Sequence, residues 1–143
     1  MVKSTTALTS TFRFGVLVRQ RLHDPFQPVR AEAMRWVARV EDEAAVADLA
    51  RLAQRTSRAP EERKTVWRTL GALKTDKALE LLALTLNTAK ESDDVIELAK
   101  VLVRSQAPQS VQFVRSQLFS SRGNPKRKVA LETALREAAV AAP

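Results

Sequence analysis

The chain has 143 residues, no cysteine, and 24 basic against 16 acidic side chains, for a formal net charge of +8. A chain of this length can bury a hydrophobic core as one domain, and the lack of cysteine excludes disulfides, thiol nucleophiles and thiolate metal sites. No apolar run approaches the roughly 20 residues that span a bilayer, so we expect a soluble, cytoplasmic protein.

The first 21 residues contain no acid and are rich in Ser and Thr, which is also the composition of an organelle transit peptide. However, Phe14, Leu17, Val18 and Leu22 fall at helical spacing and lead without a break into the next segment. We therefore expect residues 1–21 to form a cap on the fold, with a targeting segment as the alternative.

Beyond residue 21, apolar residues recur at three- and four-residue steps, which predicts an all-helical chain. Prolines at positions 25, 28, 60, 108 and 125 mark helix starts, because a first turn does not need the N–H that proline lacks. The side chains that we expect to cap helices are Asp24, Asp42, Thr75, Ser92 and Asn124.

Two local features have structural interpretations. The acid pairs at residues 61–62 and 93–94 lie in predicted first helical turns, where the helix dipole favours carboxylates, so we do not read them as catalytic. Gly71 lies within an apolar stripe and predicts a close approach between two helices.

The helical pattern repeats about every 32 to 33 residues. This period predicts units at residues 22–56, 57–90 and 91–120, the third with a two-residue insertion near Gln106, and a half-unit at 124–141. We expect all of them to form a single domain, 1–143. The positions predicted for the core are Ala33, Trp36, Val37, Val40, Val46, Leu49 and Ala53; Val66, Leu70, Leu73, Leu79, Leu82 and Leu86; Leu98, Leu102, Val111, Val114 and Leu118; and Leu131 and Leu135.

The stretch from Leu22 to Ala33 resembles the start of a HEAT repeat, with its Asp-Pro, then Val-Arg, then a small residue three positions later. The likeness covers residues 22 to about 120, and more loosely 124–140. It implies an α-solenoid of about three to four HEAT-like helix pairs, of the short kind found in bacterial accessory proteins and chromophore-attaching lyases. Because the position of Arg30 becomes Val95 in the third unit, we expect any ladder of Asp–Arg contacts between repeats to be incomplete.

Catalytic parts are scarce. His23 is the only histidine, so His-based metal cages and His-centred triads lack their components, and we interpret it as a capping or surface residue. Three glycines cannot build a phosphate-binding loop. Trp36 and Trp67 invite comparison with HEAT-like DNA glycosylases, but both lie at or beside core positions. We expect no enzymatic activity, no cofactor and no metal.

Two surfaces are candidates for binding. At 100° per residue, a set of basic positions in the first helices aligns as a basic outer column, attractive to nucleic acid or an acidic protein: Arg35, Arg39, Arg68, Lys100, Arg104 and Arg136. The second helix of each unit carries apolar residues outside the core stripe, with arginines beside them. The resemblance implies that these residues lie on the concave face of the solenoid. They are Arg51, Arg55, Leu81, Leu84, Phe113 and Arg115.

These surfaces lead to two functional expectations. The first is a non-catalytic adaptor that binds a protein or peptide partner through the second-helix residues. The alternative is a nucleic-acid-binding module that uses the basic outer column. Burial by curvature of the stack is the structural alternative for the apolar trio, and exposure of the alanines at 130, 134, 138 and 139 would favour self-association.

Overall fold

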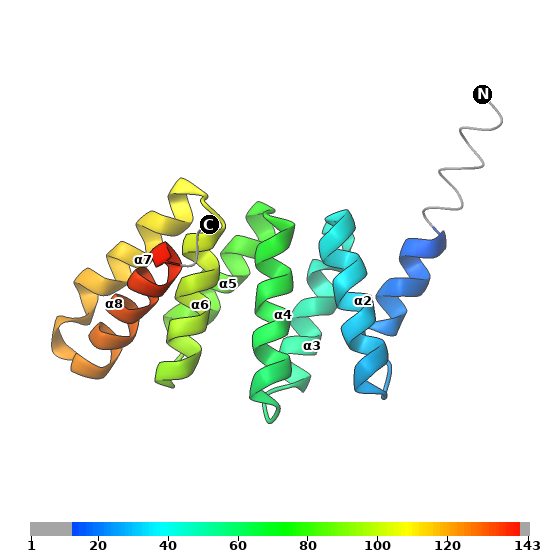
Figure 1. The fold of residues 1–143 in the computed structure, drawn as a ribbon, viewed down its shortest axis with the longest axis horizontal. Helices are drawn as coiled ribbons and strands as arrows, with labels where there is room; N and C mark the ends of the chain where they lie inside the picture. The colour runs from blue at the N-terminus through cyan, green and yellow to red at the C-terminus, as the bar shows by residue number, and fades with distance from the viewer. Residues whose placement is uncertain (1–12, 141–143) are drawn as a thin grey trace.

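The computed structural model describes residues 13–140 and consists of helices stacked side by side (Figure 1). Residues 13–21 are helical and lead into the first pair. The elements that follow are α2 (Gln27–Val40), η1 (Glu43–Ala45), α3 (Val46–Arg55), α4 (Pro60–Leu73), α5 (Asp76–Thr88), α6 (Ser92–Arg104), α7 (Pro108–Ser120), η2 (Ser121–Gly123) and α8 (Pro125–Val140). The predicted all-α solenoid is confirmed. Within the described part of the chain, no helix is long and apolar enough to cross a membrane.

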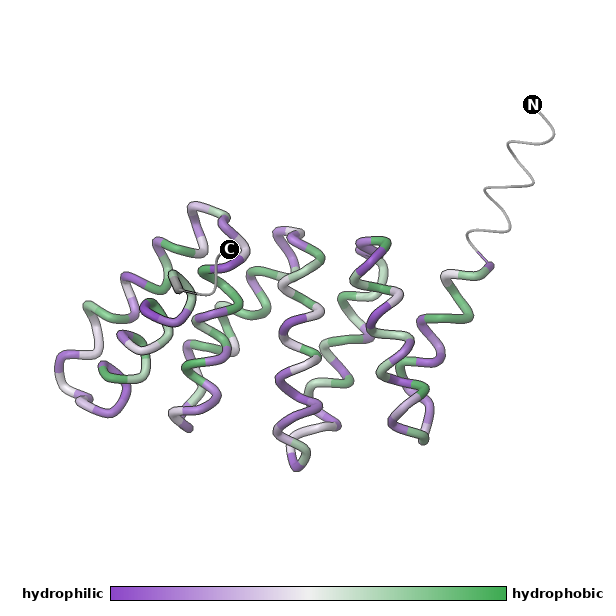
Figure 2. Tube along the Cα trace, in the orientation of Figure 1, coloured by the Kyte–Doolittle hydropathy of each residue, from purple (hydrophilic) through white to green (hydrophobic). Residues whose placement is uncertain are grey.

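The helices form two rows. In the first row α2 contacts α4, α4 contacts α6, and α6 contacts α8. In the second row α3 contacts α5, and α5 contacts α7. Each second-row helix also packs on the first-row helix of the next pair, as α3 does on α4 and α7 does on α8. Because every pair buries its apolar side on its neighbours, green and purple positions alternate along each helix in Figure 2.

The core runs along the seam between the two rows. The predicted core residues that are fully buried are Ala33, Val37, Leu49, Val66, Leu70, Leu73, Leu79, Leu82, Leu86, Leu98, Leu102, Val114 and Leu131. Half-buried side chains that pack against this core are Val46, Ala53, Leu118 and Leu135, and Val111 is also half-buried. The three-and-four spacing therefore predicted most of the seam correctly.

One core prediction in α2 is wrong, and another is only partly buried although it packs against the core. Val40 is 48% exposed, because it is the last residue of α2 and the chain turns away at Glu41, whose φ of 53° is left-handed. Trp36 is half-buried at the end of the stack, where its ring meets Phe14 edge-on with centroids 5.3 Å apart. The buried stripe is rotated toward Met34, which is 1% exposed.

The predicted caps divide into two groups. Asp42, Thr75 and Asn124 each accept a backbone N–H hydrogen bond of 3.1 to 3.2 Å at the start of the next helical element. Ser92 is not a cap, because it is already the first residue of α6. Asp24 accepts the N–H of Phe26 at 2.8 Å and so orders the turn before α2 rather than the helix itself.

Gly71 marks the closest approach between α4 and α6. A Cβ atom at this position would lie 2.3 Å from Cγ1 of Val101, a distance that side chains do not tolerate. The predicted close helix contact is therefore confirmed, and it brings two first-row helices together at the centre of the stack.

Small residues also allow α8 to pack closely on α6. Ala130, Ala134 and Ala138 are buried, and α8 makes its most extensive contact with α6. The exposed alanine face that would have favoured self-association is thus covered by the protein's own fold, and only Ala139 of that set is exposed.

Ion pairs connect successive first-row helices. Arg30 of α2 makes two hydrogen bonds to Glu62 of α4, with Nε–Oε1 at 2.6 Å and Nη2–Oε2 at 2.9 Å. Arg63 of α4 continues the series to Asp94 of α6 at 2.8 Å. At the third junction, where the arginine position is Val95, the series stops. There Arg127 of α8 instead donates to the backbone oxygens of residues 86 and 89, each at 2.8 Å.

Candidate protein-binding surface

The six predicted second-helix residues do not form one continuous site in the structure. Leu84 lies near the middle of α5 with 67% of its surface exposed. Leu81 and Phe113 are half-buried and pack against the core, each beside a different groove. Leu84 therefore stands on a ridge between two grooves.

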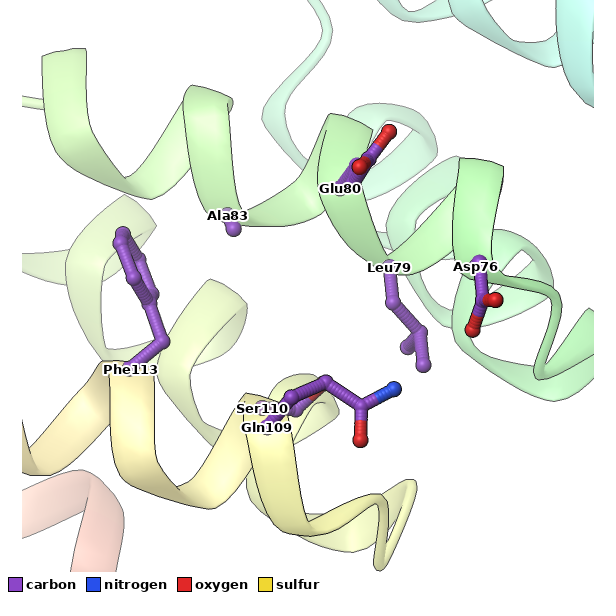
Figure 3. Close-up of a pocket in the computed structure, with 7 residues that line it drawn as sticks. All are labelled: Asp76, Leu79, Glu80, Ala83, Gln109, Ser110 and Phe113. Atoms are coloured by element: carbon purple, nitrogen blue, oxygen red, sulfur yellow. The ribbon is translucent and has the colours of Figure 1, made fainter.

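The first groove lies between α5 and α7 and encloses about 370 Å³ (Figure 3). Ala83 of α5 lies across it from Phe113 of α7, and Leu79 of α5 points toward Gln109 and Ser110. The remaining lining residues are Asp76, Glu80, Gln109 and Ser110. An apolar floor with carboxylates on one rim can accept an aliphatic side chain that carries a polar or basic end.

Local sequence explains how this groove stays open. Thr75 caps α5, with its Oγ1 accepting the N–H of Ala78 at 3.1 Å, and Pro108 begins α7 in its first turn. Near the other ends of the two helices, Gln117 donates from Nε2 to Oδ1 of Asn87 at 3.3 Å. The two helices are thus tied at one end, and the small Ala83 leaves room between them.

The second groove, about 210 Å³, lies between α3 and α5. Its lining includes Leu81 and Thr85 from α5, Ala50 and Ala53 from α3, and the edge of the buried Trp67. Trp67 is a core residue, as expected. The guanidinium of Arg63 lies 5.4 Å from its ring centroid while bonded to Asp94, so the tryptophan supports the ion pair between α4 and α6.

The three predicted arginines do not line either groove. Arg51 bonds to Asp48 on its own helix at 2.8 Å, and His23 bonds to the same carboxylate at 2.8 Å. Burial raises the pKa of Asp48, but the hydrogen bonds from His23 and Arg51 outweigh it, so the pKa lies below its usual value. Arg55 and Arg115 are exposed.

This geometry places paired helices in register along one axis, with side-chain contacts between consecutive pairs. A family profile described as HEAT repeats matches residues 16–102. The chain belongs to the HEAT-repeat family. No curated protein matches the sequence. HEAT repeats commonly mediate protein–protein interaction, which agrees with a partner-binding role in general terms.

The basic outer column of this HEAT-repeat chain is largely paired with acids. Arg35 bonds to Glu32 at 2.6 Å, Arg68 to Glu97 at 2.5 Å, and Lys100 to Glu137 at 3.0 Å. The hydrogen bond that Arg68 donates to Glu97 raises the pKa of Arg68, and Glu97 is itself buried. The other three members, Arg39, Arg104 and Arg136, are exposed. Arg35 pairs within its own helix, whereas Arg68 and Lys100 bond to the next unit, so two of the six cations help to hold the HEAT units together.

The acidic partners in the ion pairs between successive units were not predicted from the sequence. Glu62 and Asp94 were assigned only a dipole role, yet both accept hydrogen bonds from arginines 31 or 32 residues earlier. That spacing equals the HEAT period, and it is the signal that could have identified them. His23 likewise finds Asp48, 25 residues later, rather than capping a helix. Over the described residues, no cluster of three or more His, Cys, Asp or Glu side chains could hold a metal ion.

Proposed function

We propose that this protein is an adaptor that binds a segment of a partner protein along the second-row face of α3, α5 and α7. The observation that carries the proposal is Leu84, a large aliphatic side chain 67% exposed in mid-helix with an apolar-floored groove on either side. An exposed leucine alone is ordinary, but one that joins two grooves offers a continuous apolar strip.

The groove between α5 and α7 is the better anchor of the two. It is the larger, and its floor combines Leu79, Ala83 and the aromatic ring of Phe113. Interface energy concentrates where large side chains enter such recesses, while surrounding polar residues exclude water. A partner segment that crosses Leu84 and inserts one side chain beside Phe113 would use both features.

The basic outer column is not included in this proposal. Three of its six cations already bond to carboxylates of neighbouring turns or HEAT units. Releasing them for an external anion would cost contacts that connect α4 to α6 and α6 to α8. The remaining three cations are too few to justify a second function on that face.

The test uses tagged protein to capture partners from extract of the native cells, with mass spectrometry to identify them and a purified partner to measure affinity. Leu84→Asp should weaken binding of that partner about 30-fold or more, as expected for a central interface residue. The matched control is Val129→Asp, which makes the same kind of change at a side chain 60% exposed on α8. It should bind normally.

Folding must be monitored in both variants. Because Leu84 is exposed, its replacement should leave helicity unchanged and the melting temperature within about 2 °C of wild type. Phe113 packs against the core, so we would replace it with Leu rather than Asp to test the groove without emptying it. Equal binding by wild type and Leu84→Asp would contradict the proposal.

A further inference from the structure

The longest stretch of the chain without an acidic residue is strongly basic. Between Glu97 and Glu132 the sequence has seven basic residues and no Asp or Glu. The rest of the chain has 17 basic and 16 acidic residues, a net charge of +1. The stretch therefore contributes +7 of the total net charge of +8. Its members are Lys100, Arg104, Arg115, Arg122, Lys126, Arg127 and Lys128.

The fold exposes most of this charge at one end of the stack. Arg115, Arg122, Lys126 and Lys128 are exposed on α7, η2 and the first turn of α8. In the described part of the chain, none of the four lies within salt-bridge distance of a carboxylate. The basic outer column differs here, because half of its cations are paired.

An aromatic ring lies among these cations. Phe119 is 67% exposed, and the guanidinium of Arg122 lies over its ring at 4.3 Å from the centroid. Arg115 is one helical turn earlier, about 40° away around α7. Phe113 and Gln117 face α5. Around the helix, Phe119 lies about 120° from Phe113 and Arg115 about 160° from it, so both point away from the grooves.

We propose that this C-terminal basic surface, defined as Arg115, Phe119, Arg122, Lys126 and Lys128, binds single-stranded nucleic acid. Phe119, with Arg122 against its ring, stacks on an unpaired base. The other three cations, on α7 and α8, contact backbone phosphates farther along the strand. Stacking on an aromatic side chain accepts any base, and cations without carboxylate partners are free to displace counterions. A base within a duplex is already stacked on both sides, so the ring favours single strands.

The site is separate from the proposed partner-binding face. Its α7 residues lie about 120° to 160° around the helix from Phe113. The surface contains neither Leu84 nor a groove-lining residue. Variants of the two surfaces can therefore be tested independently in the same full-length protein.

The proposal is tested by measuring affinity with fluorescence anisotropy. The probes are a 5′-labelled oligo(dT) of 15 nucleotides and a labelled duplex of equal length. We expect binding of the single strand at 50 mM NaCl, weaker binding of the duplex, and a steep loss of affinity at 200 mM NaCl. Phe119→Ala should weaken binding of oligo(dT) about five-fold or more, since one stacked base contributes on that scale. Arg122→Glu with Lys128→Glu should weaken it at least ten-fold.

The matched control is a double reversal in the basic outer column, Arg35→Glu with Arg39→Glu, which changes the net charge equally. It should alter affinity for oligo(dT) less than two-fold. Equal weakening by both double reversals would show attraction to net charge alone and overturn the proposal. The proposal is also overturned if oligo(dT) does not bind at 50 mM NaCl. It is overturned as well if Phe119→Ala has no effect and a polyglutamate peptide binds more tightly than oligo(dT). The last result would indicate an acidic protein segment as the ligand.

Discussion

The two ends of this short HEAT-repeat solenoid are held together by different interactions. At the N-terminal end, charged pairs join the elements: Arg19 to Asp42 at 2.7 Å, His23 to Asp48, and Arg30 to Glu62. At the C-terminal end, α8 packs on α6 through Leu131 and small alanines, in a region from which acids are absent until Glu132. One ion pair, Lys100 to Glu137 at 3.0 Å, also joins α6 to α8. Because apolar packing supplies most of this contact, the exposed cations at that end are free for a ligand.

This comparison predicts the largest stability loss in the C-terminal seam. Leu131 is fully buried, so Leu131→Ala removes apolar contacts and leaves a cavity, at a cost of about 3 kcal/mol. Urea unfolding followed by circular dichroism measures it. Added 0.5 M NaCl should not change the difference between variant and wild type, whereas a strong salt dependence would show that charge also holds this end.

The centre of the stack tests the close helix contact. Gly71→Ala should destabilise the protein by about 2 kcal/mol, because the added methyl meets Val101 and overpacking exceeds the gain in helix propensity. Thermal unfolding measures the loss. Shortening the neighbour, as in the double variant with Val101→Ala, should recover most of it. Gly71→Ala as stable as wild type would mean that α4 and α6 separate without cost.

At the N-terminal end, Glu62→Gln should cost about 1 kcal/mol, less than a fully buried pair because the partner, Arg30, keeps some solvent contact. The hydrogen bond with Glu62 raises the pKa of Arg30, so the arginine remains charged and loses its carboxylate. A double-mutant cycle with Arg30→Met isolates the coupling. If the two losses simply add, the pair contributes nothing.

The smallest effect is a pH dependence at Asp48. Its pKa in the folded protein lies below the ordinary value of 3.8, so its contribution to stability is present above that value and is lost as pH falls through the lowered pKa. The free-energy difference between wild type and Asp48→Asn should shrink between pH 5 and pH 3, by less than about 1 kcal/mol. Chemical unfolding at both pH values checks it. A difference that is constant with pH contradicts the assigned hydrogen bonds.

The fold was largely predictable because its information is local. A period near 33 residues, prolines in first turns and apolar positions at three- and four-residue steps are all visible without a partner. The errors lie where a helix meets something other than its repeat neighbour. Val40 is exposed at a helix end. Trp36 packs against the core but is only half-buried, because its ring meets Phe14 in residues 13–21 instead of another helix pair.

The binding surfaces were less predictable. Helical wheels place Leu81, Leu84 and Phe113 outside the core stripe. They do not show that Leu81 and Phe113 pack against the core while Leu84 is exposed to solvent. The charge of the C-terminal half does not reveal the acid-free stretch, because the acidic residues from Glu91 to Glu97 offset part of its positive charge. A scan for the longest segment without Asp or Glu would have found it.

The sequence by itself determined that the chain is an all-helical HEAT repeat, because each unit carries its own apolar stripe and helix boundaries. Only the tertiary structure decided which cations are paired and where grooves form. Both depend on how far each helix rotates against its neighbours, and that rotation is set by packing, such as Gly71 against Val101 and Trp67 beneath Arg63. A rotation of one residue, about 100°, exchanges a buried position for an exposed one.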